Sequence, residues 1–464
     1  MGGGPGGYEA ALVAAQLGAQ VTLVDSDGIG GSAVLTDCVP SKAFISVGEI
    51  LGAFRDSGQL GVRSDGRHPA QLDLGIDIIG VNDRILGLAA AQSRDIAARM
   101  QAEGVRLIAG RGRLDGPGAV IADQPDGASE RLEADLVLLA TGASPRVLPA
   151  ATPDGARILT WEQVYSLREL PGHLIVVGSG VTGAEFASAF NAVGAAVTLV
   201  SSRDHVLPGE DADAAAVLEE VFAARGVRVI PRARAVAARR DGDQVHVELA
   251  DGRTITGSHC LLAVGSIPNT AELGLASAGV AVDDRGFITV DRVSRTSRRG
   301  IYAAGDCTGV LMLASVAAMQ GRIAMWHALG DAVAPLDLAR VSANVFTDPE
   351  IATVGVTQAD IDAGRITAEV VTQPLATNAR AKMGELTHGF VKLFCRPSTR
   401  IIVGGVVVAP RASELIHPVS VAVANRLTVD QVAGAFTVYP SLSGSVAEAA
   451  RRLHAPDPPA SPTG

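Results

Sequence analysis

The stretch Gly2-Gly3-Gly4-Pro5-Gly6-Gly7, directly behind Met1, decides the fold class because three of its glycines fit the pattern G-x-G-x-x-G: Gly2, Gly4 and Gly7. In a dinucleotide-binding unit the first glycine makes the turn from a strand into a helix, the second lets the backbone approach a pyrophosphate, and the third lets helix and strand pack closely. The following residues predict a helix over Tyr8–Gly18 and a strand over Gln20–Val24. Asp25 ends that strand at the spacing of the acidic residue that binds ribose hydroxyls.

A second copy of the pattern lies in the middle of the chain, at Gly178-Ser179-Gly180-Val181-Thr182-Gly183. An apolar strand at His173–Val177 precedes it, and a predicted helix over Ala184–Val193 and a strand over Ala196–Val200 follow it. Ser201 ends this strand at the same distance from the third glycine as the aspartate in the first copy. Two copies with matching internal spacing predict two dinucleotides bound by one chain.

The two copies differ at their start, because a strand precedes the glycines of the second copy whereas only Met1 precedes those of the first. The first strand is central in the usual doubly wound order. Without it, the strands predicted at Val21–Val24 and Leu136–Ala140 would lose a ladder partner, at about 1–3 kcal/mol for each orphaned backbone group. Several such losses rival the roughly 5–15 kcal/mol that keeps a domain folded. We therefore expect the native protein to begin upstream of Met1, which the mass of the natural protein would test.

The composition bounds the remaining possibilities. A chain of 464 residues exceeds one hydrophobic core, which stops growing near ~250–300 residues, so several domains are expected. Its 53 glycines and 3% aromatic residues suit α/β layers. The net charge of −10 and the lack of a Lys/Arg cluster argue against a nucleic-acid partner. No apolar run approaches the ~20 residues of a membrane span. Four scattered cysteines and no secretory pattern favour a cytoplasmic protein, and the nine histidines show no metal-ligand spacing.

The segment Gly30–Lys42 reads Gly-Gly-Ser-Ala-Val-Leu-Thr-Asp-Cys-Val-Pro-Ser-Lys and resembles the redox segment of the pyridine nucleotide-disulfide oxidoreductases. In that family two cysteines, separated by four residues, precede Ile/Val-Pro-Ser-Lys and open and close as a disulfide beside FAD. Here Cys38 keeps the second position, but Ala33 holds the first, so this disulfide cannot form. The resemblance implies FAD contacts from five residues of the segment: Gly30, Gly31, Ser32, Cys38 and Lys42.

Other segments agree with the family in order and spacing from Gly2 to Arg451. Thr141-Gly142-Ala143-Ser144-Pro145 resembles the crossing from the FAD domain into the NAD(P)H domain, and Ala263-Val264-Gly265-Ser266-Ile267-Pro268 resembles the return. Ile301–Asp306 resembles the second FAD motif, whose aspartate contacts the ribityl chain. These resemblances imply further cofactor contacts at Gly112, Thr141, Gly142, Gly265, Gly305, Asp306, Leu313 and Ala314.

The resemblance implies an α/β fold with two Rossmann-like FAD/NAD(P)-binding domains and a C-terminal α+β dimerisation domain that forms a homodimer. The expected bounds are 1–145 and 271–335 for the FAD-binding parts, 146–270 for the NAD(P)H-binding domain and 336–454 for the dimerisation domain. The segment 455–464, rich in Pro, Ser and Ala, is expected to be disordered.

Two charged residues match family residues beside the flavin ring, on its nicotinamide side: Lys42 and Glu185. A cation there favours the anionic reduced flavin, and the carboxylate compensates the buried lysine. The alternative is an ordinary solvated lysine and glutamate on helix surfaces.

The nicotinamide preference is read from Ser201-Ser202-Arg203, which ends the strand of the second copy. A carboxylate at this point would repel a 2′-phosphate, whereas hydroxyls and a guanidinium bind one. We therefore predict that Ser201 and Arg203 contact the nucleotide and that NADPH is used at least as well as NADH.

The family's proton-transfer machinery is also altered. Tyr439-Pro440-Ser441-Leu442-Ser443-Gly444 matches His-Pro-Thr-Leu-Ser-Glu, which the partner subunit contributes in the family. Tyrosine, with an ordinary pKa near ~10, is a poor base at neutral pH, and glycine orients nothing. The flavin face opposite the nicotinamide would then be a small slot lined by Ala33, Val34 and Cys38, with Tyr439 from the other subunit. Such a slot suits a flat acceptor such as a quinone.

We therefore expect an FAD-dependent NAD(P)H:quinone oxidoreductase whose catalytic residues are Lys42, Glu185, Tyr439 and Cys38. Two alternatives stay open. One is a peroxide or small-disulfide reductase that works through the Cys38 thiolate. The other is a low-turnover flavin-binding protein that senses redox state or binds a partner.

Overall fold

The computed structural model describes residues 1–72 and 74–454, so the tail expected to be disordered at 455–464 lies outside the described residues. The chain forms two compact units. Among the described residues, unit 1 comprises 1–46, 76–178 and 234–337, and unit 2 comprises 47–72, 74–75, 179–233 and 338–454. Within the described ranges, no helix is long and apolar enough to cross a membrane.

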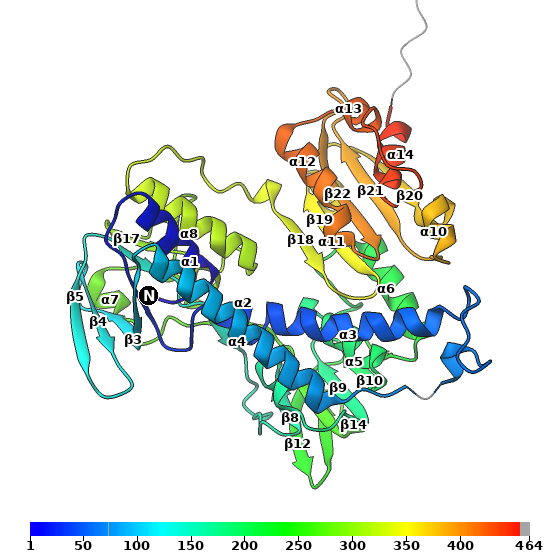
Figure 1. Cartoon of the computed structure of the whole chain (residues 1–464), viewed down its shortest axis with the longest axis horizontal. Helices are drawn as coiled ribbons and strands as arrows, with labels where there is room; N and C mark the ends of the chain where they lie inside the picture. Colours follow the sequence, from blue (N-terminus) through cyan, green and yellow to red (C-terminus); the bar gives the residue numbers. More distant parts are fainter. Residues whose placement is uncertain (73, 455–464) are drawn as a thin grey trace, which may run out of the picture. The chain divides into compact units, whose positions relative to one another are not determined.

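The first nucleotide-binding region belongs to unit 1 and contains two separate pairs of parallel strands. One pair is β1 (Thr22–Asp25) with β2 (Arg106–Ala109), and the other is β6 (Val137–Leu139) with β17 (Ile301–Ala303). Three helices accompany them: α1 (Pro5–Gln16), α4 (Ile78–Ala102) and α8 (Ala314–Ala328). Figure 1 shows α1 lying along α8.

Helix α1 begins at Pro5 and not at Tyr8 as predicted, because the glycine pattern itself forms the first turn. Proline suits the first helical position, where its missing N–H costs no hydrogen bond. Small residues let the backbones of α1 and α8 approach, since a Cβ atom on Gly321 would lie 2.1 Å from the Gly6 carbonyl oxygen. This close packing brings the start of α8 beside the turn formed by Gly2–Gly7, which we call the glycine turn.

Unit 1 also holds three smaller sheets. An antiparallel meander contains β3 (Arg111–Leu114), β4 (Ala119–Asp123) and β5 (Ser129–Glu133). A second contains β12 (Ala235–Asp241), β13 (Gln244–Leu249) and β14 (Thr254–Gly257). At the predicted domain crossing, β7 (Ala143–Pro145) pairs with β16 (Ser266–Pro268). The short α2 (Gly31–Leu35) and α7 (Leu275–Ala278) also belong to unit 1, together with the start of α3 (Cys38–Asp56).

The second glycine pattern follows a strand, as predicted. In unit 1, β9 (His173–Val177) pairs in parallel with β15 (His259–Leu262), which pairs with β8 (Ile158–Thr160). In unit 2, α5 (Val181–Ala192) is followed by β10 (Ala196–Val200), α6 (Ala212–Ala224) and β11 (Arg228–Ile230). The predicted bounds of β9 and β10 are confirmed at both ends.

The rest of unit 2 is an antiparallel sheet in the order β18-β19-β22-β21-β20, covered by helices (Figure 1). Its strands are β18 (Ser342–Val345), β19 (Glu350–Gly355), β20 (Glu369–Pro374), β21 (Phe390–Cys395) and β22 (Ile402–Ala409). The helices are α9 (Gln358–Asp362), α10 (Ala379–Met383), α11 (Ala412–Leu415), α12 (His417–Asn425), α13 (Val429–Ala433) and α14 (Gly444–Arg452). Buried side chains such as Val407 and Leu393 of the sheet, Val419 of α12 and Ala449 of α14 form one core. The predicted fold class is confirmed.

Candidate functional site

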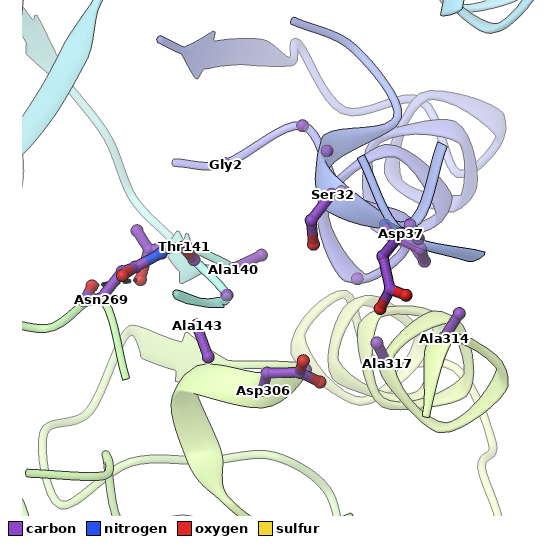
Figure 2. A pocket seen from close by; sticks show the side chains of 18 of the residues that line it. Gly2, Ser32, Asp37, Ala140, Thr141, Ala143, Asn269, Asp306, Ala314 and Ala317 are labelled. Carbon is purple, nitrogen blue, oxygen red and sulfur yellow. Dashed lines mark hydrogen bonds between the residues drawn. The ribbon is translucent and has the colours of Figure 1, made fainter. Parts of the chain in front are cut away.

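The glycine turn, the redox segment and the second FAD motif meet in one pocket of unit 1 with a volume of about 470 Å³. Figure 2 shows the backbone at Gly2 and the side chains of Ser32, Asp37 and Asp306 around this pocket. Eleven of the predicted site residues line the pocket: Gly2, Gly4, Asp25, Gly31, Ser32, Cys38, Thr141, Gly142, Gly305, Asp306 and Ala314.

Glycine is required for steric reasons at two positions of the turn and at Gly31 of the redox segment, which packs against it. Gly2 has φ +98°, and a Cβ atom there would lie 2.2 Å from the Ala140 carbonyl oxygen. A Cβ atom on Gly7 would lie 1.9 Å from the carbonyl oxygen of Gly2, and one on Gly31 would lie 2.7 Å from the Cα atom of Gly4. Such contacts are far inside van der Waals distance, so the backbone can run this closely past itself only without side chains.

Two helices begin at the pocket without a side-chain cap. The N-cap of α1 is Gly4, which has no side chain, and that of α8 is Leu313, whose side chain has no acceptor atom. The uncapped N–H groups and the positive end of each helix dipole suit an anion such as pyrophosphate. No lysine or arginine stands among the described residues that line the pocket. The residues therefore fit FAD, with its pyrophosphate held by backbone groups.

Asp25 fixes the shape of the turn through its own carboxylate. Its Oδ2 atom accepts a hydrogen bond of 2.7 Å from the Gly3 N–H, and its Oδ1 atom accepts bonds from Asp27 and Gly28 at 3.0 and 2.6 Å. These bonds hold the loop after β1 against the glycine turn. The predicted contact of Asp25 with ribose hydroxyls stays a prediction.

The lining contains acidic residues that the sequence reasoning missed. Asp37 and Glu162 both line the pocket, and Figure 2 shows the Asp37 and Asp306 side chains pointing into the same space. Burial and the nearby Asp37 carboxylate raise the pKa of Asp306 to about 6. Burial, Asp27 and Asp37 also raise the pKa of Glu162. Asp37 could have been identified as a pocket residue from its position directly before Cys38 in the redox segment.

The raised pKa of Asp306 predicts a pH-dependent stability of the flavin-free protein. The folded state holds the proton more tightly than the unfolded chain, so stability falls as pH rises from about 4 to about 6. Asp306→Asn should remove this loss and stabilise the flavin-free protein at pH 7.5 by roughly 2 kcal/mol. Thermal melts at pH 4 and 7.5 would measure the effect, with the exposed Asp95→Asn as the matched control. Equal melting temperatures of wild type and Asp306→Asn at pH 7.5 would contradict the prediction.

The redox segment forms two helical pieces at the pocket wall. Ala33 lies on α2 and Cys38 begins α3, and both line the pocket. The expectation that Val34 also lines the acceptor slot is wrong. Val34 is buried, and its side chain lies against Gly30, where a Cβ atom would be 2.5 Å from the Val34 Cβ.

Five of the residues expected around FAD stand outside the pocket lining: Gly7, Gly30, Lys42, Gly112 and Leu313. The glycines of the redox segment and the turn shape the backbone, and Leu313 caps α8. Gly112 lies on β3, where a Cβ atom would be 3.0 Å from the Met1 side chain. Lys42 is half-buried on α3. Their cofactor contacts stay predictions.

The second glycine pattern repeats the geometry of the first. Gly178 has φ +112°, and a Cβ atom there would lie 2.1 Å from the Ala263 carbonyl oxygen. Gly180 caps α5 without a side-chain bond, and Val181, Thr182 and Gly183 form its first turn. Gly265 has φ +95° and open space around its Cα atom.

The expected phosphate contact of Ser201 is wrong, because its side chain is fully buried. Its hydroxyl lies 2.7 Å from the Ser179 hydroxyl and accepts a bond of 3.1 Å from the Arg203 N–H. Ser201 therefore shapes the loop after β10, whereas Ser202 and Arg203 are exposed.

Glu185 is not a solvated surface residue, since only 5% of it is exposed. Its Oε1 atom accepts a hydrogen bond of 2.8 Å from the Phe346 N–H, so it joins α5 to the segment after β18 within unit 2. A buried carboxylate at this position fits the predicted role. Its pairing with Lys42 of unit 1 stays a prediction.

Tyr439 lies in a strongly exposed apolar segment of unit 2. Phe436 is fully exposed, and Val438 and Tyr439 are 79% and 85% exposed. Large apolar side chains gathered in one exposed segment mark an interaction surface.

Comparison with known proteins agrees with this geometry. Residues 1–321 match the family model of the pyridine nucleotide-disulphide oxidoreductases, and residues 341–450 match the dimerisation domain of the same family. A protein of Mycobacterium tuberculosis named NAD(P)H dehydrogenase (quinone) is 58% identical over 98% of this chain and 94% of its own length. Dihydrolipoyl dehydrogenase 2 of Haloarcula marismortui is 33% identical over 97% of this chain and 95% of its own length.

The crystal structure of LpdA from Mycobacterium tuberculosis has a TM-score of 0.93 at 57% identity and covers 98% of this chain and 99% of its own. The family uses FAD and NAD(P)H, which agrees with the glycine turn and the uncapped helices of the pocket. The chain therefore belongs to the pyridine nucleotide-disulphide oxidoreductases.

Proposed function

We propose that the chain is an FAD-dependent NAD(P)H:quinone oxidoreductase that works without a redox-active disulfide. The observation that carries the proposal is Ala33, which lies with Cys38 on the wall of the FAD pocket. A methyl group therefore stands where a second thiol would be needed. The other cysteines, Cys260, Cys307 and Cys395, are buried. Burial raises the thiol pKa of Cys260 to about 12 and that of Cys307 to about 11, so neither supplies a thiolate at neutral pH.

Each part of the pocket has a role in this reaction. The glycine turn and the starts of α1 and α8 would hold the pyrophosphate, and Asp306 would receive the ribityl hydroxyls. FAD, when bound, accepts a hydride from the reduced nicotinamide and passes electrons to the acceptor. Lys42 would favour the anionic reduced flavin, and the methyl of Ala33 would leave room for a flat ring. The name of the mycobacterial relative supports a quinone as that ring.

Replacing Cys38 by serine tests whether a thiol takes part. We expect NADPH:menadione turnover to stay within about twofold of wild type, because no step needs the sulfur. We also expect both proteins to leave lipoamide and oxidised glutathione unreduced. Stopped-flow absorbance at the flavin band, after mixing with NADPH and then with menadione, measures the two half-reactions. Loss of menadione turnover in Cys38→Ser would point to the thiol reductase instead, and reoxidation no faster than in air would point to a binding protein.

We further propose that NADPH is used at least as well as NADH, with Arg203 and Ser202 as the 2′-phosphate ligands in place of the buried Ser201. Arg203→Glu should lower kcat/KM for NADPH by about tenfold or more and change it little for NADH, since a carboxylate repels only the extra phosphate. Arg228→Glu, the same charge change at another exposed arginine of unit 2, is the control. A strong preference of wild type for NADH would contradict the proposal.

We propose a cytoplasmic homodimer in which Tyr439 and its apolar neighbours are covered by the second subunit. Their exposure in the family's dimerisation domain supports this arrangement. The wall opposite the nicotinamide would then be completed by Tyr439 of the other subunit.

A further inference from the structure

Two loops of unit 2 each carry an exposed arginine where β10 and β11 end. The two strands pair in parallel, so both end at the same edge of the sheet. Residues 201–207 follow β10 and are called the β10 loop, and residues 231–233 follow β11 and are called the β11 loop. Arg203 of the β10 loop and Arg232 of the β11 loop are both exposed. Ligands of open α/β sheets bind outside this edge.

Backbone hydrogen bonds hold the two arginines next to each other. The pairing of the strands continues past their ends, because the Ser201 N–H donates to the Ile230 carbonyl at 2.9 Å. The Ala233 N–H in turn donates to the Ser201 carbonyl at 2.7 Å. A further bond of 2.8 Å joins the arginines directly, from the Arg232 N–H to the Arg203 carbonyl. Arg232 has φ +50°, a left-handed conformation that residues other than glycine rarely adopt. This bond therefore fixes where the Arg232 side chain leaves the backbone.

The β10 loop is anchored to the second glycine pattern at both of its ends. The Ser201 and Ser179 hydroxyls lie 2.7 Å apart, and both residues are buried. At the other end of the loop, the Leu207 N–H donates to the Ser179 carbonyl at 2.8 Å. Ser179 directly precedes Gly180, the N-cap of α5, where the uncapped helix start suits the pyrophosphate of a dinucleotide. The arginines therefore stand at a fixed position relative to that anion site.

A carboxylate beside the two arginines holds Arg232 only weakly. The Arg232 Nε atom lies 3.8 Å from the Asp204 Oδ1 atom, and both side chains are 79% exposed. An exposed ion pair at this distance contributes little to stability, so an anion of higher charge displaces it readily. A phosphate group is such an anion, and its oxygens accept hydrogen bonds from two guanidinium groups at once.

We propose that Arg232 is a second specificity-determining residue for NADPH, which joins Arg203 in binding the 2′-phosphate, and that Asp204 competes with this phosphate for Arg232. The inference rests on the proposed use of NADPH. Ser202 adds a hydroxyl from the same loop. When NADH binds, its ribose carries no phosphate, so Arg232 stays with Asp204. The Arg232 guanidinium therefore contributes to the discrimination between the two nucleotides and not to the binding of both.

The test uses two ligands that differ only in the 2′-phosphate, NADP⁺ and NAD⁺, titrated calorimetrically into the oxidised FAD-loaded protein. We expect Arg232→Gln to weaken the binding of NADP⁺ by about fivefold or more and to change that of NAD⁺ by less than about twofold. The control Arg228→Gln makes the same change at the exposed start of β11 and should leave both affinities unchanged.

Replacing Asp204 tests the competition with the opposite sign. Asp204→Asn should tighten the binding of NADP⁺ by about two- to fivefold, because it removes the competing anion from Arg232. In the double variant Arg232→Gln/Asp204→Asn this gain should be smaller, since the two residues act on the same phosphate contact.

The results distinguish a failure of this inference from a failure of the proposal on which it rests. If Arg232→Gln binds NADP⁺ as tightly as wild type while Arg203→Gln binds it less tightly, Arg232 has no role and the use of NADPH stands. If wild type binds NADP⁺ less tightly than NAD⁺, the proposed use of NADPH fails, and the inference fails with it. An equal gain from Asp204→Asn with and without Arg232 would overturn the competition for this arginine.

Discussion

Gly7→Ala is expected to yield a protein that is purified largely without FAD. The added Cβ atom would lie 1.9 Å from the Gly2 carbonyl oxygen and 3.0 Å from its carbon. Both atoms belong to the backbone of the turn, so the clash is relieved only when α1 moves away from the turn. Overpacking of this kind costs about 1–3 kcal/mol, and the same displacement moves the uncapped start of α1 that binds the pyrophosphate. Because this free-energy cost destabilises the conformation that binds FAD, we expect the affinity for FAD to drop roughly 10- to 100-fold.

The control for this variant is Gly87→Ala, which makes the same change inside helix α4, where a Cβ atom meets nothing within 4 Å. It should leave FAD content unchanged and stabilise the protein by up to about 1 kcal/mol through helix propensity. The ratio of flavin absorbance to protein absorbance after purification, followed by titration with FAD, measures the effect. Equal FAD affinity of Gly7→Ala and Gly87→Ala would show that the third glycine is not needed for close packing.

The sequence predicts the fold best at positions where a close backbone contact allows only one type of residue. Only glycine fits at Gly2, Gly7 and Gly178. The two glycine patterns in the sequence therefore suffice to predict both turns, and the strand His173–Val177 with them. The helix starts were predicted about three residues late because glycines lower helix propensity, yet here they lie in the first turn, where tertiary packing overrides propensity.

The residues that the sequence analysis missed or assigned to another role are those whose role depends on burial. Ser201 has a hydroxyl that suits a phosphate, but the bond to Ser179 removes it from the surface. Asp37 reads as a polar residue of a loop, but the break between α2 and α3 turns it into the pocket beside Asp306. Spacing along the chain does not predict where these two side chains point, because Asp37 depends on the break between α2 and α3 and Ser201 on its bond to Ser179.

Lys392→Met is expected to cause the largest loss of stability in unit 2. Lys392 lies on β21 with 3% of its side chain exposed, and its Nζ atom contacts both oxygens of Asp211 at 2.9 and 2.8 Å and Asp213 at 2.6 Å. Asp211 is also the N-cap of α6 and is itself 4% exposed. Methionine fills the space of the lysine stem but leaves the Asp211 carboxylate buried without its cation. Breaking a buried pair from one side costs about 3–5 kcal/mol.

A loss of that size should lower the melting temperature of the holoenzyme by roughly 10 °C, whereas Lys382→Met at an exposed site of α10 should change it little. The double variant Lys392→Met/Asp211→Asn separates charge from packing. Asparagine keeps the cap of α6 but carries no charge, so the double variant should recover a large part of the loss. A double variant less stable than Lys392→Met alone would mean that packing around the lysine stem, and not the stranded carboxylate, holds α6 against the sheet.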